Sequence, residues 1–216
     1  MLIPFETLRK RFNVRPTGVL HVGANVGEEA EAYHHGGIKT VVWIEGNPDL
    51  LPALRENLAE YPHNYIFNFL AGDENRRAIL HVSNNAGQSS SVLELGTHKI
   101  AHPEVHYTHD VEVPMYRLDE PGVLDFYVVD GYIPLLDDLD FLNIDAQGFE
   151  LNILKGMGEK LRQFKWAYLE VNKKELYKGC ALVEDLDMYL LGFGFRRVVT
   201  EWAGNTGWGD ALWVRK

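Results

Sequence analysis

The chain has 216 residues, of which 46% are hydrophobic and 24% are charged, which is ordinary usage for a globular protein. We therefore expect one domain over residues 1–216. The 31 Asp and Glu residues outnumber the 21 Lys and Arg residues and leave a formal net charge of -10. Such a balance repels phosphate backbones, so we expect no nucleic-acid partner.

Cysteine content and hydropathy indicate the compartment. The only cysteine is Cys180, so no disulfide forms within the chain and a reducing, cytoplasmic location is expected. The first residues lack the basic stretch and apolar core of a signal peptide. No apolar run approaches the ~20 residues that a membrane-spanning helix needs, so we expect no membrane span. The oligomeric state stays open.

Strand and helix patterns alternate along the first third of the chain, after a helical extension over residues 1–16. Three short apolar runs predict buried strands, at residues 19–22, 40–44 and 65–70. Helical spacing predicts one helix over residues 28–35 and a second that begins at Asn47 and ends before Pro62.

The middle of the chain is less regular. Residues 78–82 predict a strand, and residues 84–138 are predicted as an irregular insert. Four histidines follow one another at spacings of four, four and three residues: His98, His102, His106 and His109. Because Pro103 interrupts a helix there, a solvated loop is predicted, with a metal site as the alternative.

Regular patterns return in the last third. Strands are predicted at residues 141–145, 166–171, 195–200 and 211–214, and helices at residues 149–155 and 183–191. The last two strands are joined by a turn-rich segment and are predicted to pair antiparallel. The whole pattern predicts an α/β fold with a mostly parallel seven-stranded sheet, an antiparallel last strand and helices on both faces.

The first strand ends in a glycine-containing loop, Gly23-Ala24-Asn25-Val26-Gly27. Open α/β sheets bind ligands at the carboxyl ends of their strands, so this loop is a candidate ligand site. It is shorter than the dinucleotide fingerprint, because Asn25 stands where the second glycine would be and Gly27 comes one residue early. Glu28 and Glu29 follow it and would repel a pyrophosphate. The loop favours an uncharged or cationic cofactor.

Glu45 ends the second strand, 22 residues after Gly23. In this architecture an acid at that place accepts hydrogen bonds from ribose hydroxyls, although an exposed strand-end carboxylate is the alternative interpretation. Together with the glycine loop, Glu45 favours a cofactor that contains a nucleoside. Ala71 and Asp73, at the end of the third strand, would then border the adenine, with a turn as the alternative role for Asp73.

Three segments carry a family resemblance: residues 22–27, residues 85–91 with the sequence NAGQSSS, and residues 142–150 with the sequence LNIDAQGFE. With them the chain resembles the FkbM family of class I S-adenosylmethionine-dependent methyltransferases, from about residue 17 to residue 200. The resemblance implies a Rossmann-like fold, S-adenosyl-L-methionine as cofactor and methyl transfer to a hydroxyl of a sugar, glycan or other small natural product. Residues 84–138 would then lie near the acceptor.

The predicted contacts with this cofactor come from the strand ends and the segments above. They are Gly23, Ala24, Asn25, Gly27, Glu28, Glu45, Gly46, Asn47, Ala71, Asp73, Ser90 and Asp145. The chain departs from the family where His21 replaces an acid that helps to hold the cofactor's amino acid end, and Glu28 or Glu29 are the candidates to replace that acid. Residues 125–136 resemble an insertion, in which Tyr127 and Tyr132 are candidates to shape the acceptor site.

Asp145 is the predicted catalytic residue, because it ends the strand that faces the cofactor's methyl group in this fold. It would act as a general base or as a metal ligand. Asp145, Glu170 and Asn172 end adjacent predicted strands and form an oxygen set suited to Mg²⁺, although the resemblance itself implies no metal.

Two other classes share parts of this pattern. An NAD(P)-dependent oxidoreductase would have the same fold and an acid at position 45, but it needs the longer glycine loop. A non-catalytic nucleoside-binding module would keep the sheet without needing Asp145 and Glu170.

Overall fold

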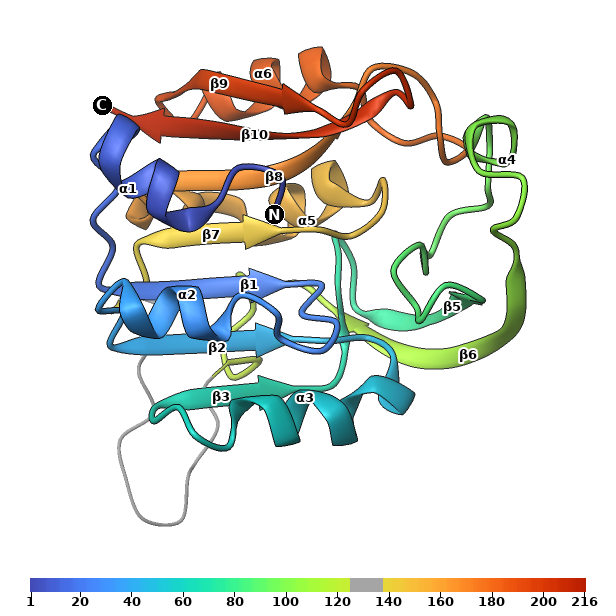
Figure 1. Ribbon diagram of the computed structural model, residues 1–216, viewed down its shortest axis with the longest axis horizontal. Coiled ribbons are helices and arrows are strands. Elements are labelled where there is room, and N and C mark those ends of the chain that lie inside the picture. Colours follow the sequence, from blue (N-terminus) through green and yellow to red (C-terminus); the bar gives the residue numbers. More distant parts are fainter. Residues whose placement is uncertain (125–137) are drawn as a thin grey trace.

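A seven-stranded sheet forms the centre of the computed structural model, which describes residues 1–124 and 138–216 (Figure 1). Its order is β3-β2-β1-β7-β8-β10-β9. The strands are β1 (Gly18–Val22), β2 (Thr40–Ile44), β3 (Asn64–Phe67), β7 (Phe141–Ile144), β8 (Trp166–Asn172), β9 (Phe195–Trp202) and β10 (Trp208–Arg215). Neighbours from β3 to β8 pair in parallel, and β10 pairs antiparallel with both β8 and β9. The predicted sheet and its antiparallel last strand are confirmed.

Helices cover both faces of this sheet (Figure 1). One face carries α1 (Phe5–Phe12), α2 (Ala30–His35) and α3 (Leu51–Leu58), and the other carries α5 (Glu150–Met157) and α6 (Val183–Leu191). Short helices complete the set: η1 (Pro48–Leu50), α4 (His98–Ala101) and η3 (Gly158–Gln163). Alternate strand residues join opposite layers, since Val41 and Trp43 of β2 pack with α1 to α3, whereas Val42 and Ile44 pack with α5 and α6.

A second, three-stranded sheet has the order β4-β6-β5. Its strands are β4 (Leu70–Ala71), β5 (Arg76–Ser83) and β6 (Tyr107–Tyr116). The strand predicted over residues 65–70 is confirmed at β3, but its predicted end is wrong, since β3 ends at Phe67 and β4 belongs to the other sheet. Between them, the Asn68 amide donates to the backbone carbonyls of Glu45 and Gly46, 2.8 and 3.2 Å away, and this bond turns the chain out of the main sheet.

The irregular segment predicted over residues 84–138 contains the long strand β6, which pairs antiparallel with β5. Apolar residues alternate only at Val111, Val113 and Met115, and residues 108–110 are polar and exposed, so the pattern covers half of the strand and the prediction missed it. The segment over residues 125–136, with Tyr127 and Tyr132, lies outside the described residues.

The carboxyl ends of β1, β2, β7 and β8 meet at one edge of the main sheet, and the second sheet and α4 lie beyond that edge (Figure 1). This arrangement brings residues 85–105 over the strand ends. Within residues 1–124 and 138–216, no helix has both the length and the apolar character needed to cross a membrane.

Candidate active site

A cavity of about 590 Å³ lies at the carboxyl ends of the central strands, between the main sheet and residues 85–105. It is lined by nine of the residues predicted to contact the cofactor: Gly23, Ala24, Asn25, Glu28, Glu45, Gly46, Ala71, Ser90 and Asp145. Glu170 lines it as well. Residues that are far apart in the sequence therefore share one concave site, which is where α/β sheets bind ligands.

Three predicted contact residues do not line the cavity. Gly27 packs against the side chains of α3, and the Asn47 side chain accepts a hydrogen bond from the Asp49 backbone and so caps η1. The Asp73 carboxylate accepts a hydrogen bond from Asn152, 2.9 Å away. Each has a local packing or capping partner, and we assign none of them a contact with a ligand.

The glycine loop runs directly against the end of β7. Gly23 has a φ of +82°, and a Cβ atom on it would lie 1.7 Å from the carbonyl oxygen of Asp145. Its backbone N–H donates to the Ile44 carbonyl, 2.9 Å away, at the end of β2. Only glycine allows this approach, so the missing side chain joins the ends of β1, β2 and β7 into one wall of the cavity.

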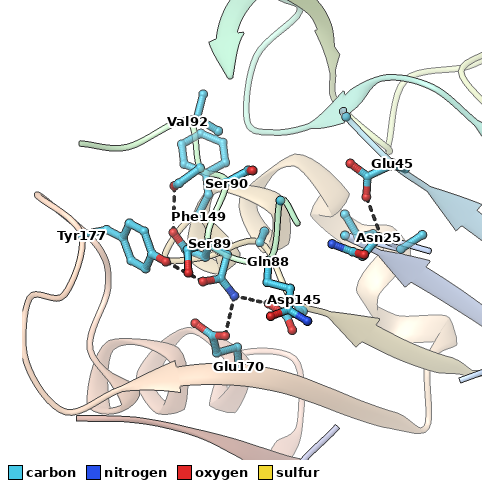
Figure 2. A pocket seen from close by; sticks show the side chains of 18 of the residues that line it. Asn25, Glu45, Gln88, Ser89, Ser90, Val92, Asp145, Phe149, Glu170 and Tyr177 are labelled. Carbon is cyan, nitrogen blue, oxygen red and sulfur yellow. Dashed lines mark hydrogen bonds between the residues drawn. The ribbon is translucent and has the colours of Figure 1, made fainter. Parts of the chain in front are cut away.

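Glu45 is buried at the end of β2, and both of its carboxylate oxygens accept backbone hydrogen bonds. One oxygen accepts from the Asn25 backbone at 2.7 Å (Figure 2). The other oxygen accepts from the Asn47 backbone at 2.6 Å. Burial raises the pKa of Glu45 to about 7, although these backbone donors oppose the shift. Each oxygen keeps a further lone pair, so the carboxyl group is held ready to accept hydroxyl hydrogens from a ligand.

Asp145 and Glu170 form an acid pair on the floor of the cavity (Figure 2). The side-chain amide of Gln147 donates to Asp145 at 2.6 Å and to Glu170 at 2.7 Å. The Asp145 carboxylate faces the cavity, and protein surrounds the cavity. Desolvation by this surrounding protein and the charge of Asp210 raise the pKa of Asp145 to about 6. Burial and the neighbouring charge of Asp145 raise the pKa of Glu170 as well. Both carboxyl groups therefore hold a proton more tightly than an exposed acid does.

Comparison with known proteins gives this architecture a family. Residues 21–197 match the model of the methyltransferase FkbM domain. The chain belongs to the FkbM methyltransferase family. The 2-O-methyltransferase NoeI of Sinorhizobium fredii is 26% identical over 168 residues, which cover 74% of this chain. The match spans only 65% of the length of that relative.

Solved methyltransferase structures share the fold of this FkbM family member. Magnesium protoporphyrin IX methyltransferase from Synechocystis PCC 6803 with bound SAH matches with a TM-score of 0.51 and 12% identity, covering 97% of this chain and 78% of that chain. A putative tRNA (m1A22) methyltransferase from Streptococcus pneumoniae, in complex with S-adenosyl-L-methionine, matches with a TM-score of 0.50 and 14% identity, covering 95% of this chain and 69% of that chain. These likenesses establish the class I methyltransferase fold.

His21, where this FkbM family member departs from the expected acid, is a core residue at the cavity wall. Its ring stacks on Trp43 with centroids 4.8 Å apart, and its Nδ1 lies 3.3 Å from the Tyr33 hydroxyl. Burial lowers the pKa of His21 to about 4, so the imidazole is neutral at pH 7. Glu29 lines the same cavity with a side chain that is 16% exposed, and its charge acts on His21. Glu29 thus brings an acid to the part of the cavity that His21 leaves uncharged.

The predicted metal set is only partly assembled. Asp145 and Glu170 lie on either side of the Gln147 amide, whereas Asn172 is fully buried and is not among the residues that line the cavity. Both polar atoms of the Asn172 side chain lack a hydrogen-bond partner in the described structure. Across the described ranges, no cluster of three or more His, Cys, Asp and Glu residues has the geometry to hold a metal ion.

The histidine-rich segment is only partly a solvated loop. His98 lies on α4 and is 5% exposed, and its ring centroid is 5.0 Å from that of His102. Both of these residues line the cavity, whereas His106 and His109 are exposed. The prediction of a solvated loop is therefore wrong for His98, because α4 packs its ring against Tyr177.

Several residues of this site were not predicted from the sequence. Asp210 of β10 lines the cavity because the antiparallel pairing places it opposite Glu170. Tyr177 lies on the segment between β8 and α6, where no local pattern marks it. Gln147 lies within the FkbM segment over residues 142–150, and this segment was the one sequence feature that could have assigned Gln147 to the site.

Proposed function

We propose that this chain is an S-adenosyl-L-methionine-dependent O-methyltransferase that acts on a hydroxyl of a sugar, glycan or other small natural product. One observation carries the proposal: the fold brings Gly23, Glu45 and Asp145 to the wall of one cavity. Membership of the FkbM methyltransferase family supports methyl transfer. Similarity to a 2-O-methyltransferase supports a hydroxyl acceptor.

The residues at the strand ends fit the parts of the cofactor. Glu45 has free lone pairs for ribose hydroxyls, and Ala71 would border the adenine. The backbone from Gly23 to Asn25 offers a close approach without a Cβ atom at its first residue. We assign the cofactor's amino group to Glu29, since His21 is neutral and a carboxylate attracts an ammonium group. Glu29 already pairs with one such group, the Met1 ammonium 3.2 Å away, and the cofactor's amino group would share or replace this pair. Gly46, Ser90 and Glu28 complete the wall.

Asp145 is assigned the role of general base. When bound, S-adenosyl-L-methionine would supply an electrophilic methyl carbon, and its sulfonium sulfur would take the electron pair of the carbon–sulfur bond as the methyl group leaves for the acceptor oxygen. The acceptor hydroxyl must also lose its proton, and the Asp145 carboxylate, which is open to the cavity, accepts it. Phe149 and Val92 add an apolar part to the cavity wall (Figure 2).

The charge of the cavity supports an uncharged acceptor. Acids line it from several elements: Glu28, Glu29, Glu45, Glu104, Asp145, Glu170 and Asp210. No Lys or Arg of the described chain is among its lining residues. A phosphorylated or polyanionic acceptor would be repelled here, whereas sugar hydroxyls find many hydrogen-bond partners.

Metal dependence is tested separately. Of the three residues predicted to hold Mg²⁺, only Asp145 and Glu170 line the cavity, and an ion held there would make transfer depend on Mg²⁺. Activity should be measured before and after dialysis against EDTA and after addition of Mg²⁺. Loss and recovery of activity would support the metal set, and unchanged activity would exclude a required ion.

Titration calorimetry with S-adenosylhomocysteine and with NAD tests the cofactor. We expect binding of S-adenosylhomocysteine alone. Binding of NAD alone would favour an oxidoreductase, and binding of neither would favour a non-catalytic module.

Transfer of a labelled methyl group to a panel of glycans then tests the reaction. We expect Asp145→Asn to lower kcat by roughly 100-fold or more, in the range of general-base catalysis, while it still binds S-adenosylhomocysteine. Full activity of this variant would remove Asp145 from the role of base.

A further inference from the structure

Gln147 is the meeting point of four hydrogen bonds at the floor of the cavity. Its side-chain nitrogen donates to Asp145 and to Glu170, and its side-chain oxygen accepts from the Tyr177 hydroxyl. Its backbone carbonyl accepts from the Ser91 hydroxyl, 2.8 Å away. Four segments of the chain are therefore joined through one residue.

The backbone at Gln147 is held in an uncommon conformation. Its φ is +51°, in the left-handed region that residues other than glycine seldom adopt. Gly148 follows with a φ of +96°. This turn points the backbone carbonyl of Gln147 at Ser91 and its side chain at the acid pair, so a locally unfavourable conformation is kept where several contacts depend on it.

Tyr177 determines which way the Gln147 amide faces. The nitrogen carries two hydrogens, one for each carboxylate, and the oxygen accepts from the tyrosine. Burial raises the pKa of Tyr177, so its hydroxyl remains a donor. A flipped amide would set the Gln147 oxygen against the carboxylate oxygens of Asp145 and Glu170. Tyr177 itself is held in a buried cluster with Leu95, Leu176 and Cys180.

We propose that Gln147 is a positioning residue of the methyl-transfer reaction: its amide holds the Asp145 carboxylate in place beside Glu170, and Tyr177 orients the amide. This inference rests on the proposed function, because it takes Asp145 as the base. The Ser91 bond adds that residues 85–91, which wall the cavity, are anchored on the same residue. Loss of the amide would leave two neighbouring acids without a shared donor and free Asp145 to turn away.

The test compares Gln147→Met, which keeps the length of the side chain and removes its hydrogen bonds, with Tyr177→Phe and the double variant. With the best acceptor of the glycan panel, we expect Gln147→Met to lower kcat by roughly 10- to 100-fold, the effect of a misplaced reacting group. The KM for the acceptor and the affinity for S-adenosylhomocysteine should change by less than about threefold. Tyr177→Phe should lower kcat by a smaller factor than Gln147→Met does. The kcat of the double variant should be no lower than that of Gln147→Met, because both substitutions act through the same Gln147 amide.

Matched controls lie outside the cavity. Gln163→Met removes an amide that donates to the Leu139 carbonyl, and Tyr61→Phe removes a hydroxyl near the end of α3. Both should keep kcat within about twofold of the wild type. Wild-type kcat in Gln147→Met would overturn the inference, and so would additive losses in the double variant.

A measurement without any acceptor complements the kinetics. In ¹H–¹⁵N spectra of the free protein, the side-chain amide signals of Gln147, assigned by their loss in Gln147→Met, should exchange slowly with solvent. In Tyr177→Phe this exchange should become at least about tenfold faster. Equal exchange rates in both proteins would overturn the role of Tyr177. Failure of the wild type to bind S-adenosylhomocysteine would instead overturn the proposed function, so the two failures are distinguishable.

Discussion

At the residue scale, the absence of a side chain at Gly23 allows the ends of β1 and β7 to lie against each other at the site. A Cβ atom there would overlap the Asp145 carbonyl oxygen, and the φ of +82° strains any other residue. The close approach of β1 to β7 and the position of the proposed base thus depend on the same glycine.

We expect Gly23→Ala to lower the free energy of unfolding by roughly 3 kcal/mol or more, because backbone strain adds to a steric clash. Binding of S-adenosylhomocysteine should be lost. The control is Gly37→Ala, at a φ of +78° with no atom within 4 Å of the added Cβ, which should cost only about 1 kcal/mol. Urea unfolding and calorimetry measure both quantities, and equal losses in the two variants would contradict the clash.

Glu45 makes the stability of the free protein depend on pH. Its folded-state pKa of about 7 lies above the ordinary value of 4.5, so the native state binds a proton more tightly than the unfolded chain does. Its contribution is therefore complete below about pH 4.5 and is lost as the pH rises through about 7. The loss is on the order of 3 kcal/mol.

Urea unfolding at pH 5 and at pH 8 measures this contribution. The wild type should lose more stability between the two values than Glu45→Gln, whose side chain does not ionise and still accepts a backbone hydrogen bond. The comparison with the variant isolates Glu45 from the other buried acids. An identical pH dependence in both proteins would show that Glu45 has an ordinary pKa.

At the scale of elements, the pairing of β8 with β10 decides which acids face the cavity. Asp210 stands opposite Glu170, and its carboxylate accepts hydrogen bonds from the Tyr168 hydroxyl and the Leu2 backbone. The Tyr168 hydroxyl accepts in turn from the backbone N–H of Ile3, 3.0 Å away. The N-terminal segment is thereby fastened to the sheet next to the proposed site.

Tyr168→Phe should destabilise the protein by about 1–3 kcal/mol, since it leaves a buried N–H and a buried carboxylate each without one partner. Tyr61→Phe, outside this network, should change the free energy of unfolding by less than about 0.5 kcal/mol. Urea unfolding of the two variants checks the difference. Equal stability of both would mean that the N-terminal segment is not held through Tyr168.

The bounds of a strand were predicted best where the strand is buried on both faces. The apolar run over residues 40–44 is β2 with the same bounds, because both faces of this strand lie under helices. The run over residues 65–70 crosses from one sheet to the other, a turn decided by the Asn68 side chain. In β6 apolar residues alternate only at Val111, Val113 and Met115, and residues 108–110 are polar and exposed, so a sequence pattern detects only half of this strand.

At the scale of the whole molecule, the formal net charge of -10 is matched by a cavity lined with acids. This field should attract a positively charged group and repel a phosphate backbone, so we expect no nucleic-acid partner. This distinction matters because one structure with the same fold is that of a putative tRNA methyltransferase.

We expect no binding of a structured RNA oligonucleotide at 50 mM salt, where electrostatic attraction to phosphates is strong. Fluorescence anisotropy with a labelled RNA, up to about 10 μM protein, measures this. A basic RNA-binding protein serves as the positive control. Binding that weakens steeply with added salt would contradict the proposed class of acceptor.

The sequence by itself determined where β1, β2 and β7 end, and hence Gly23, Glu45 and Asp145, because short apolar runs and the residues that follow them are local features. Only the tertiary structure decided that Tyr177 orients Gln147, that Asp210 faces Glu170 and that His98 is buried at the cavity wall. These contacts join side chains far apart in the sequence. The pairing of strands and the packing of residues 85–105 over their ends create them, and no local spacing of residues records such contacts.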